Sequence, residues 1–341
     1  MISGPYGVGA WSSRTWRDSA LSWLDEQLAA AGRERTGEVE QTRLRPWATV
    51  LRAPTADGPV WLKAAGPGTA FEVALYGVLV RTVPDHALTP IAADPARGWL
   101  LLPDGGPTLG EREAGTDLVD ALTRAMVQYA RLQRELEPRV DELLGLGLAD
   151  MRPAAMPARF GEALEAVAAG SERNADAKGR DIQRQVAAMK GTVASWCERL
   201  DASPVPPSID HNDLHPWNIL GAEGGDFRYY DWGDSVVAHP FAAMRLPLFF
   251  AQRALEAGLE DARLVRLRDA YLEVFEDLAP HEELVEWLVL AGHVGKVARV
   301  LTWQRALQAA REQGEELDDD WATALRETLA ALLEESYVAG G

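Results

Sequence analysis

Hydrophobic and polar positions divide the chain into a β-rich first part and a helical second part. Near the start, Ser12 or Ser13 can cap a helix over residues 16–31, whose apolar side chains fall on one stripe. Short β-prone runs follow, with turn signals such as APTADG between them and one helical run among them. The expected strands are residues 37–45, 48–53, 59–64, 89–94 and 98–104, and the expected helix is residues 66–83.

After the breaker PDGGP, apolar residues recur almost throughout at helical spacing. The chain is therefore expected to be α+β, with two domains. Residues 1–104 form an N-terminal domain of one helix, a five-stranded antiparallel sheet and a second helix, and residues 105–341 form a larger, mainly helical domain. The expected helices of the second domain are residues 117–136, 157–170, 178–200, 240–257, 259–277, 282–311 and 319–337.

Composition and charge disfavour several classes of protein. The chain has 341 residues, 47% of them hydrophobic and 25% charged, which is ordinary for a globular protein. A net charge of −18 without a block of Lys and Arg disfavours a nucleic-acid partner. No apolar run approaches the roughly 18 residues that span a bilayer, and the N-terminus lacks the pattern of a secretion signal. We therefore expect a cytoplasmic protein without a membrane partner, and the pattern favours no particular oligomeric state.

The segment HNDLHPWNIL, residues 211–220, carries the most specific chemical pattern. It contains the spacing His-x-Asp-Leu-x-x-x-Asn, and Asp-x-Gly follows at Asp231. In kinases this pattern provides an Asp that takes the proton of the acceptor hydroxyl, and an Asn and a second Asp that hold Mg²⁺. Asp213 is therefore the candidate catalytic residue, and Asn218 and Asp231 are the candidate metal ligands.

The residues between the two motifs predict a hairpin. Turn-forming glycines in residues 221–226 separate two β-prone runs, one after Asn218 and one before Asp231. If these runs pair, Asn218 and Asp231 come to one end of the hairpin.

HNDLH also permits a different interpretation, in which a transition metal such as zinc is bound for hydrolysis. The ligands would be His211, Asp213 and His215. Such a site needs further His or carboxylate ligands, and none is linked to the motif nearby.

Lys63 ends the run PVWLK, and Glu72 follows nine residues later. Together with HNDLHPWN and DWGD, these residues resemble the motifs of the aminoglycoside phosphotransferase and choline-kinase-like family of small-molecule kinases. The resemblance covers most of the chain. It implies a two-lobed protein-kinase-like fold, with a small antiparallel β-sheet lobe and a larger helical lobe. It also implies ATP as the phosphate donor, or GTP as in some members, Mg²⁺ as a cofactor, and a small molecule with a hydroxyl group as the acceptor.

The resemblance assigns expected roles to residues of the first lobe. Lys63 is expected to contact the α- and β-phosphates, and Glu72 to hold this lysine by an ion pair. Main-chain groups of the segment that joins the lobes, at Leu102 and Asp104, are expected to face the adenine. The first hairpin lacks the glycine-rich cover of protein kinases, so Thr49 becomes a candidate nucleotide contact there.

Several residues of the second lobe have more than one interpretation. His211 is expected to support the loop rather than to take part in the chemistry. His215 either approaches the transferred phosphate or caps the loop, and Asp234 either bonds the loop, assists a second metal or faces the substrate. Residues further along, some of which can share a helical face, are candidates for the acceptor site. They are His293, Lys296, Arg299 and Trp303.

The favoured hypothesis is a kinase of a small hydroxylated metabolite, an amino sugar or an antibiotic. No activation loop or A-P-E segment follows DWGDS, which disfavours a protein substrate. The runner-up is a nucleotide-binding regulatory pseudokinase with little or no turnover. The presence of Lys63, Asp213, Asn218 and Asp231 argues against it, because a protein that only binds nucleotide has no need of a proton acceptor.

Overall fold

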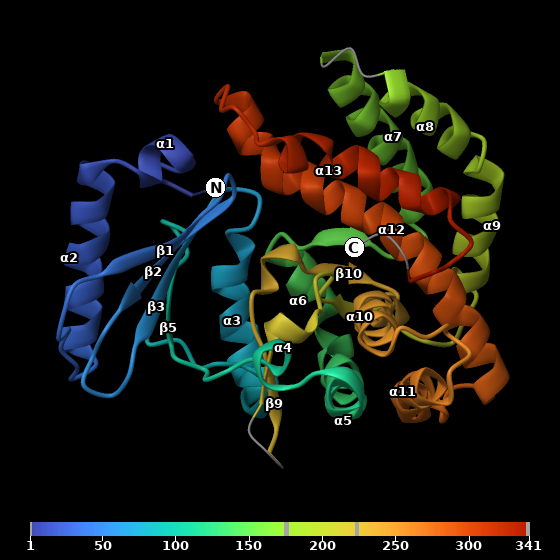
Figure 1. Ribbon diagram of the computed structural model, residues 1–341, viewed down its shortest axis with the longest axis horizontal. Coiled ribbons are helices and arrows are strands. Elements are labelled where there is room, and N and C mark those ends of the chain that lie inside the picture. The colour runs from blue at the N-terminus through green and yellow to red at the C-terminus, as the bar shows by residue number, and fades with distance from the viewer. Residues whose placement is uncertain (1, 174–176, 222–224, 339–341) are drawn as a thin grey trace. The chain divides into compact units, whose positions relative to one another are not determined.

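The computed structural model describes residues 2–173, 177–221 and 225–338, and its fold is α+β (Figure 1). The chain forms two compact units. Unit 1 comprises the residues up to Gly106 together with Arg305–Asp319, and unit 2 comprises Pro107–Gln304 and the residues from Asp320 onward. Within the described ranges, no helix is long and apolar enough to cross a membrane.

Unit 1 contains the five-stranded antiparallel sheet that the sequence predicts. The strand order is β1-β2-β3-β5-β4, and each neighbouring pair is antiparallel. The strands are β1 (Glu40–Leu44), β2 (Ala48–Ala53), β3 (Val60–Ala65), β4 (Ala92–Asp94) and β5 (Trp99–Pro103). The helices of this part of the chain are α1 (Val8–Trp11), α2 (Arg14–Ala30) and α3 (Phe71–Thr82).

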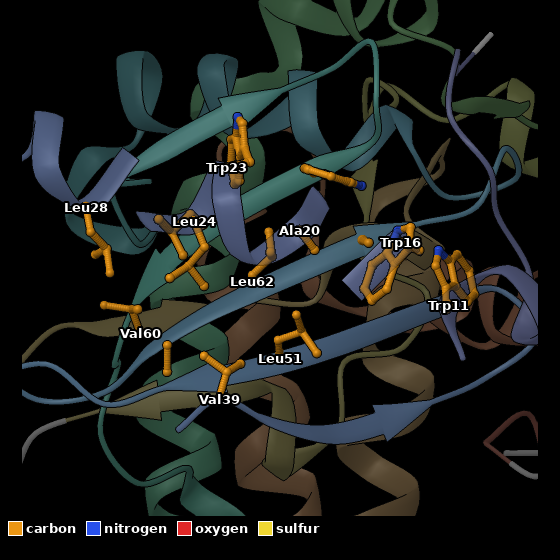
Figure 2. Packing of buried hydrophobic residues seen from close by; sticks show 14 residues of the cluster. Trp11, Trp16, Ala20, Trp23, Leu24, Leu28, Val39, Leu51, Val60 and Leu62 are labelled. Carbon is orange, nitrogen blue, oxygen red and sulfur yellow. The ribbon is translucent and has the colours of Figure 1, made fainter. Parts of the chain in front are cut away.

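Helix α2 covers one face of this sheet (Figure 2). Ser13 caps the helix, as expected, by accepting a hydrogen bond from the backbone N–H of Trp16 at 3.2 Å. Trp23 packs edge to face on Trp99 of β5, with the ring centroids 5.5 Å apart. Burial of each leucine here contributes about 1.5–3 kcal/mol of transfer free energy, so the apolar stripe of α2 stabilises the sheet. The stripe consists of Trp16, Ala20, Trp23, Leu24 and Leu28.

Strand β3 turns alternate side chains to opposite faces of the sheet. Val60, Leu62 and Ala64 belong to the core beneath α2. Lys63 lies between two of them in sequence, so its side chain projects from the other face. There it meets Glu72 of α3.

Unit 2 is mainly helical and holds two small sheets. One is three-stranded in the order β6-β10-β7, with β10 parallel to β6 and antiparallel to β7, and the other is the hairpin of β8 and β9. The strands are β6 (Ala149–Met151), β7 (Ser208–Asp210), β8 (Ile219–Gly221), β9 (Phe227–Tyr229) and β10 (Val236–Ala238). The helices are α4 (Leu109–Arg112), α5 (Gly115–Leu136), α6 (Val140–Gly145), α7 (Met156–Arg173), α8 (Ala177–Ala187), α9 (Lys190–Asp201), α10 (Arg245–Leu255), α11 (Ala262–Leu272), α12 (His281–Glu312), whose last turns count with unit 1, and α13 (Asp319–Ala330).

The predicted pairing of the runs on either side of the glycine-rich turn is confirmed. Strands β8 and β9 pair antiparallel, and the N–H of Tyr230 donates to the Asn218 carbonyl at 3.2 Å. Asn218 and Asp231 therefore flank the same end of the hairpin. Residues 222–224 of the predicted turn lie outside the described residues.

Several helical predictions for unit 2, among them those over 259–277 and 319–337, differ in detail from the structure, where these helices are α11 and α13. The helix expected over residues 178–200 is two helices, α8 and α9, because the chain tightens between them into a turn in which Met189 donates to the Val186 carbonyl at 2.9 Å. The helix expected from residue 240 begins as a 3-10 helix, Pro240–Met244, before α10.

Candidate active site

The loop that follows β7 carries the candidate catalytic residues, and contacts of His211 hold this loop in place. The backbone N–H of His211 donates to the buried Tyr129 hydroxyl at 3.0 Å. Its ring is buried, packs on Trp232 with the centroids 4.7 Å apart, and lies with Nε2 3.0 Å from the Tyr230 carbonyl oxygen. Burial lowers the pKa of His211, so the neutral ring donates its Nε2 proton to that oxygen. His211 therefore fastens the loop to the hairpin.

Asn212 turns the loop with a left-handed backbone at φ 59°, a conformation that asparagine tolerates better than most residues. Its N–H donates to Asp210 Oδ1 at 2.8 Å, and its side-chain Nδ2 donates to Thr302 Oγ1 at 2.8 Å. Burial raises the pKa of Asp210 to about 6. No motif points to these contacts, yet they shape the turn that presents Asp213.

Asp213 presents a carboxylate whose side chain is 24% exposed. Its Oδ1 lies 3.0 Å from Nη2 of Arg299, and its Oδ2 lies 3.6 Å from Nε2 of His215. The side-chain Nδ2 of Asn218 donates to the Asp213 backbone carbonyl at 2.9 Å. A carboxylate held in one orientation in this way can align an acceptor hydroxyl for in-line attack.

Asn218 and Asp231 provide the oxygen atoms expected of a magnesium site. Because Nδ2 of the buried Asn218 is bonded to the loop, its Oδ1 is the amide atom left for a cation. Asp231 follows β9 directly and has a left-handed backbone, φ 62° and ψ 55°, a conformation that is uncommon outside glycine and concentrates at functional sites.

The donor set suits Mg²⁺ better than a transition metal. In the described part of the chain, no three His, Cys, Asp or Glu side chains are grouped so that they could hold a metal ion. Mg²⁺ keeps several waters and phosphate oxygens as ligands and needs only one or two side chains, as Asn218 and Asp231 provide. The zinc interpretation of His211 and His215 requires a three-ligand group of protein side chains.

In unit 1, Lys63 and Glu72 form a close ion pair. Nζ lies 2.5 Å from Oε2, and the side chains are 15% and 2% exposed. The buried carboxylate fixes the direction of the ammonium group, which keeps some access to solvent. Breaking a buried pair by removing one partner costs about 3–5 kcal/mol, so this arrangement is strongly constrained.

Thr49, a candidate nucleotide contact, lies inside the β1–β2 hairpin. It is fully buried, its hydroxyl donates to the Arg43 carbonyl at 2.8 Å, and the same oxygen accepts from Gln41 Nε2 at 2.8 Å. The hydroxyl therefore both donates and accepts inside the β1–β2 hairpin.

Leu102 and Asp104 lie at the end of the sheet, as their sequence position requires. Leu102 is 8% exposed within β5, where it pairs with Trp61. Asp104 is exposed, and its Oδ1 accepts from the Gly106 N–H at 3.0 Å. The Asp104 side chain thus shapes the turn that closes the first segment of unit 1.

Several solved structures are similar to this one over almost their whole length. An ethanolamine kinase from Plasmodium vivax has a TM-score of 0.64 at 12% identity, covering 97% of this chain and 91% of that chain. A macrolide 2′-phosphotransferase from Brachybacterium faecium has a TM-score of 0.54 at 16% identity, with 93% and 98% covered. An ADP-bound aminoglycoside phosphotransferase has a TM-score of 0.54 at 12% identity, with 92% and 98% covered. No family model matches the sequence, and the comparison with curated proteins found no match.

The chain has a protein-kinase-like fold. At these identities the likeness establishes the fold, which is the one that the sequence motifs implied. The acceptors that the names of these proteins mention belong to those proteins.

Within this kinase-like fold, Arg299 does not have the open position expected of a substrate contact. It is 7% exposed, and its Nη1 lies 2.5 Å from Oδ2 of Asp234 while Nη2 holds Asp213. Trp303 packs against the guanidinium at 4.8 Å and against Trp321 at 5.5 Å between ring centroids. In this structure, carboxylates of the chain occupy both terminal nitrogens of Arg299.

His293 and Lys296 of α12 contact other segments of unit 2. His293 stacks on Trp196 of α9 with the ring centroids 4.8 Å apart, and burial lowers its pKa to about 4. Lys296 is fully buried and donates to the carbonyls of Ala331 and Ser336 at 2.8 and 2.6 Å. The two side chains fasten α12 to α9 and to the C-terminal segment.

An aromatic cluster beside Asp213 has no counterpart among the expected site residues. Trp217 is 45% exposed and packs edge to face on Phe250 of α10 at 5.5 Å, and His215 packs on both rings at 5.9 and 6.0 Å. Gly110 lets the Trp217 ring approach α4 closely, since a Cβ there would lie 2.5 Å from the ring. A tryptophan inside the catalytic segment is the signal that points to this surface, which can contact an apolar part of an acceptor.

Proposed function

We propose that the protein is a small-molecule kinase that uses ATP and Mg²⁺ to phosphorylate a hydroxyl group of its acceptor. The observation that carries this proposal is the arrangement of Asp213, Asn218 and Asp231, in which one side chain presents a carboxylate and two present oxygen ligands at one end of a hairpin. ADP in one similar structure supports nucleotide use. GTP is the alternative donor.

In the proposed reaction, the acceptor oxygen forms a bond to the γ-phosphorus while the bond from that phosphorus to the β–γ bridging oxygen breaks. The hydroxyl proton passes to Asp213 Oδ2, and the nucleoside diphosphate leaves. Asn218 and Asp231 would hold Mg²⁺, which would supply positive charge to the phosphate oxygens. Within unit 1, Lys63, directed by Glu72, offers an ammonium group that suits the phosphate oxygens of a nucleotide. In this proposal the first lobe binds the nucleotide and the helical lobe binds the acceptor.

The function is tested with a panel of hydroxyl compounds and Mg²⁺-ATP, with nucleotide consumption as the first readout. The panel contains aminoglycosides, macrolides, amino sugars, ethanolamine, choline-like alcohols and homoserine. Mass spectrometry of the acceptor identifies the phosphorylated product. No turnover with any acceptor and no Mg²⁺-dependent nucleotide binding would show that the proposal is wrong.

Asp213→Asn separates an enzyme from a regulatory nucleotide-binding protein. The substitution keeps the shape but removes the proton acceptor, so we expect kcat to fall by about 10²–10⁴-fold while nucleotide affinity is retained. Asp226→Asn is the matched control, because Asp226 is exposed in the hairpin of β8 and β9. Equal kcat in wild type and Asp213→Asn would contradict the role given to Asp213.

A further inference from the structure

Arg299 of α12 connects two carboxylates that the kinase motifs place on different segments. Its Nη2 lies 3.0 Å from Asp213 Oδ1 on the loop, and its Nη1 lies 2.5 Å from Asp234 Oδ2, just after the hairpin. Nη1 also lies 3.4 Å from the Asn212 carbonyl oxygen, which accepts from it. One guanidinium therefore spans the candidate catalytic loop and the metal-binding segment.

The geometry uses the planar shape of the guanidinium. Two terminal nitrogens in a fixed fork can hold two oxygen acceptors at a set separation, which a lysine ammonium cannot do with the same rigidity. Burial acts to lower the pKa of Arg299, but the carboxylates of Asp213 and Asp234 outweigh this effect and the pKa is raised. The cation is therefore permanent, and Trp303 lies against its face.

Helix α12 fixes the Arg299 backbone relative to this loop by a second contact. Thr302, one turn further along α12, accepts from Asn212 Nδ2 at 2.8 Å and donates to the Ala298 carbonyl at 3.1 Å. Arg299 and Thr302 thus hold neighbouring residues of the same loop from one face of one helix. A side chain anchored in this way has little freedom to change rotamer.

We propose that Arg299 is a positioning residue, which holds Asp213 through Oδ1 so that Oδ2 is the oxygen that receives the acceptor proton. Asp234 then serves to hold the second half of the guanidinium. This inference rests on the proposed function, and it gives Asp234 a role through Arg299 that differs from the three that the sequence left open. It also explains why Arg299 is buried beside a residue that must stay accessible.

The test compares Arg299→Lys with wild type on the acceptor found in the panel. Lysine keeps the charge but cannot span both carboxylates, so Asp213 loses its orientation. A misplacement of about 1 Å at the reacting atoms lowers kcat by about 10²-fold, and this is the loss we expect. The KM for the acceptor and the affinity for nucleotide are expected to stay at their wild-type values, because Arg299 is buried and its terminal nitrogens face oxygens of the chain.

Asp234→Asn provides a second variant that breaks only one half of the bridge. We expect a smaller loss of kcat with the same unchanged KM, and the double variant with Arg299→Lys to be no worse than Arg299→Lys alone, because both act through one interaction. Arg266→Lys is the matched control, since Arg266 forms an exposed ion pair with Asp120 at 2.9 Å on α11 and α5. Thermal unfolding of each variant shows whether it is folded.

The outcomes distinguish the positioning role of Arg299 from the proposed function. Wild-type kcat in Arg299→Lys, or a loss confined to the KM for the acceptor, overturns the positioning role while the kinase proposal stands. Additive losses in the double variant also overturn it. If wild type phosphorylates nothing in the panel, the proposed function fails and the inference fails with it.

Discussion

Two carboxylates on either side of His211 have opposite surroundings. Asp210 is 1% exposed, and burial raises its pKa to about 6, whereas Asp213 reaches solvent and is paired with Arg299. Arg245, also buried, lies close enough to interact with Asp210, and burial lowers the pKa of Arg245 to about 10. Charges that shape the loop are thus buried, whereas the candidate catalytic carboxylate reaches solvent.

His239, which follows β10, makes stability depend on pH. Burial lowers its pKa to about 3, and its Nδ1 accepts from the Phe241 N–H at 3.4 Å. The unfolded chain takes up a proton below about pH 6.5, while the folded chain does not do so until about pH 3. The unfolded state therefore binds more protons in this window, and the contribution of His239 to stability is lost as the pH falls through it.

His239→Asn removes this titration while its side-chain oxygen can still accept from the Phe241 N–H at the start of the 3-10 helix. We expect the free energy of unfolding of wild type, relative to the variant, to decrease by up to about 1.4 kcal/mol per pH unit below about pH 6.5. Asp210 titrates in both proteins, so its contribution to the pH dependence cancels in the difference between them. Urea unfolding at several pH values measures the difference, and a constant difference contradicts the expectation.

A local motif leads from the sequence to candidate residues, whereas a partner that is distant in the sequence does not show. Asp213, Asn218 and Asp231 are candidates because of their spacing, and the short hairpin brings Asn218 and Asp231 to the same end. Arg299 was interpreted as a substrate contact because nothing near it in sequence shows that Asp213 and Asp234 occupy its guanidinium. Only the packing of α12 on the loop reveals that partnership.

Among the elements, the strands of the first sheet and the β8–β9 hairpin were predicted from the sequence, whereas the three-stranded sheet of unit 2 was not. Strands β6 and β10 have three residues each, too few to show a period of two. Each exists because it pairs with another segment, β10 with both β6 and β7. These segments are strands because they pair in the assembled sheet.

Helix α10 ends at a residue whose backbone favours glycine. Glu256 has φ 49° and ψ 42°, and its N–H donates to the Arg253 carbonyl at 3.3 Å. A left-handed conformation costs an L-residue about 1–2 kcal/mol, and glycine avoids this cost at the end of a helix. We expect Glu256→Gly to raise the free energy of unfolding by about 1 kcal/mol, measured by urea unfolding.

Glu165→Gly is the control, because Glu165 is also exposed but lies inside α7. There glycine is expected to lower stability by about 1 kcal/mol. Changes of the same sign in both variants would mean that the loss of the glutamate side chain, rather than the backbone, decides the result.

At the scale of the whole molecule, the α+β fold and its kinase-like type were predicted from the motifs and the change of pattern after PDGGP. The membership of residues 305–319 in unit 1 was not predicted from the sequence. These residues continue α12, and no change of composition marks their contacts. A Cβ on Gly68 would clash with the Arg305 carbonyl oxygen, and the Arg305 guanidinium lies 5.4 Å from the centre of the Phe71 ring.

Gly68→Ala tests the close approach of this segment within unit 1. The added methyl group meets backbone atoms that have little room to shift, so we expect the free energy of unfolding to fall by about 1–3 kcal/mol. Gly77→Ala is the matched control on α3, because a Cβ there meets nothing within 4 Å. It is expected to raise stability by about 0.5–1 kcal/mol. Equal effects in thermal or urea unfolding would refute the close contact.

The split composition of unit 1 has a consequence for how the protein is made. A ribosome releases the sheet and α3 early, but Arg305–Asp319 leaves it only after nearly the whole of unit 2 has been synthesised. The first unit to be translated is therefore among the last to be completed. During translation its surface around Gly68 lacks the contact with Arg305 until the end of α12 has been synthesised.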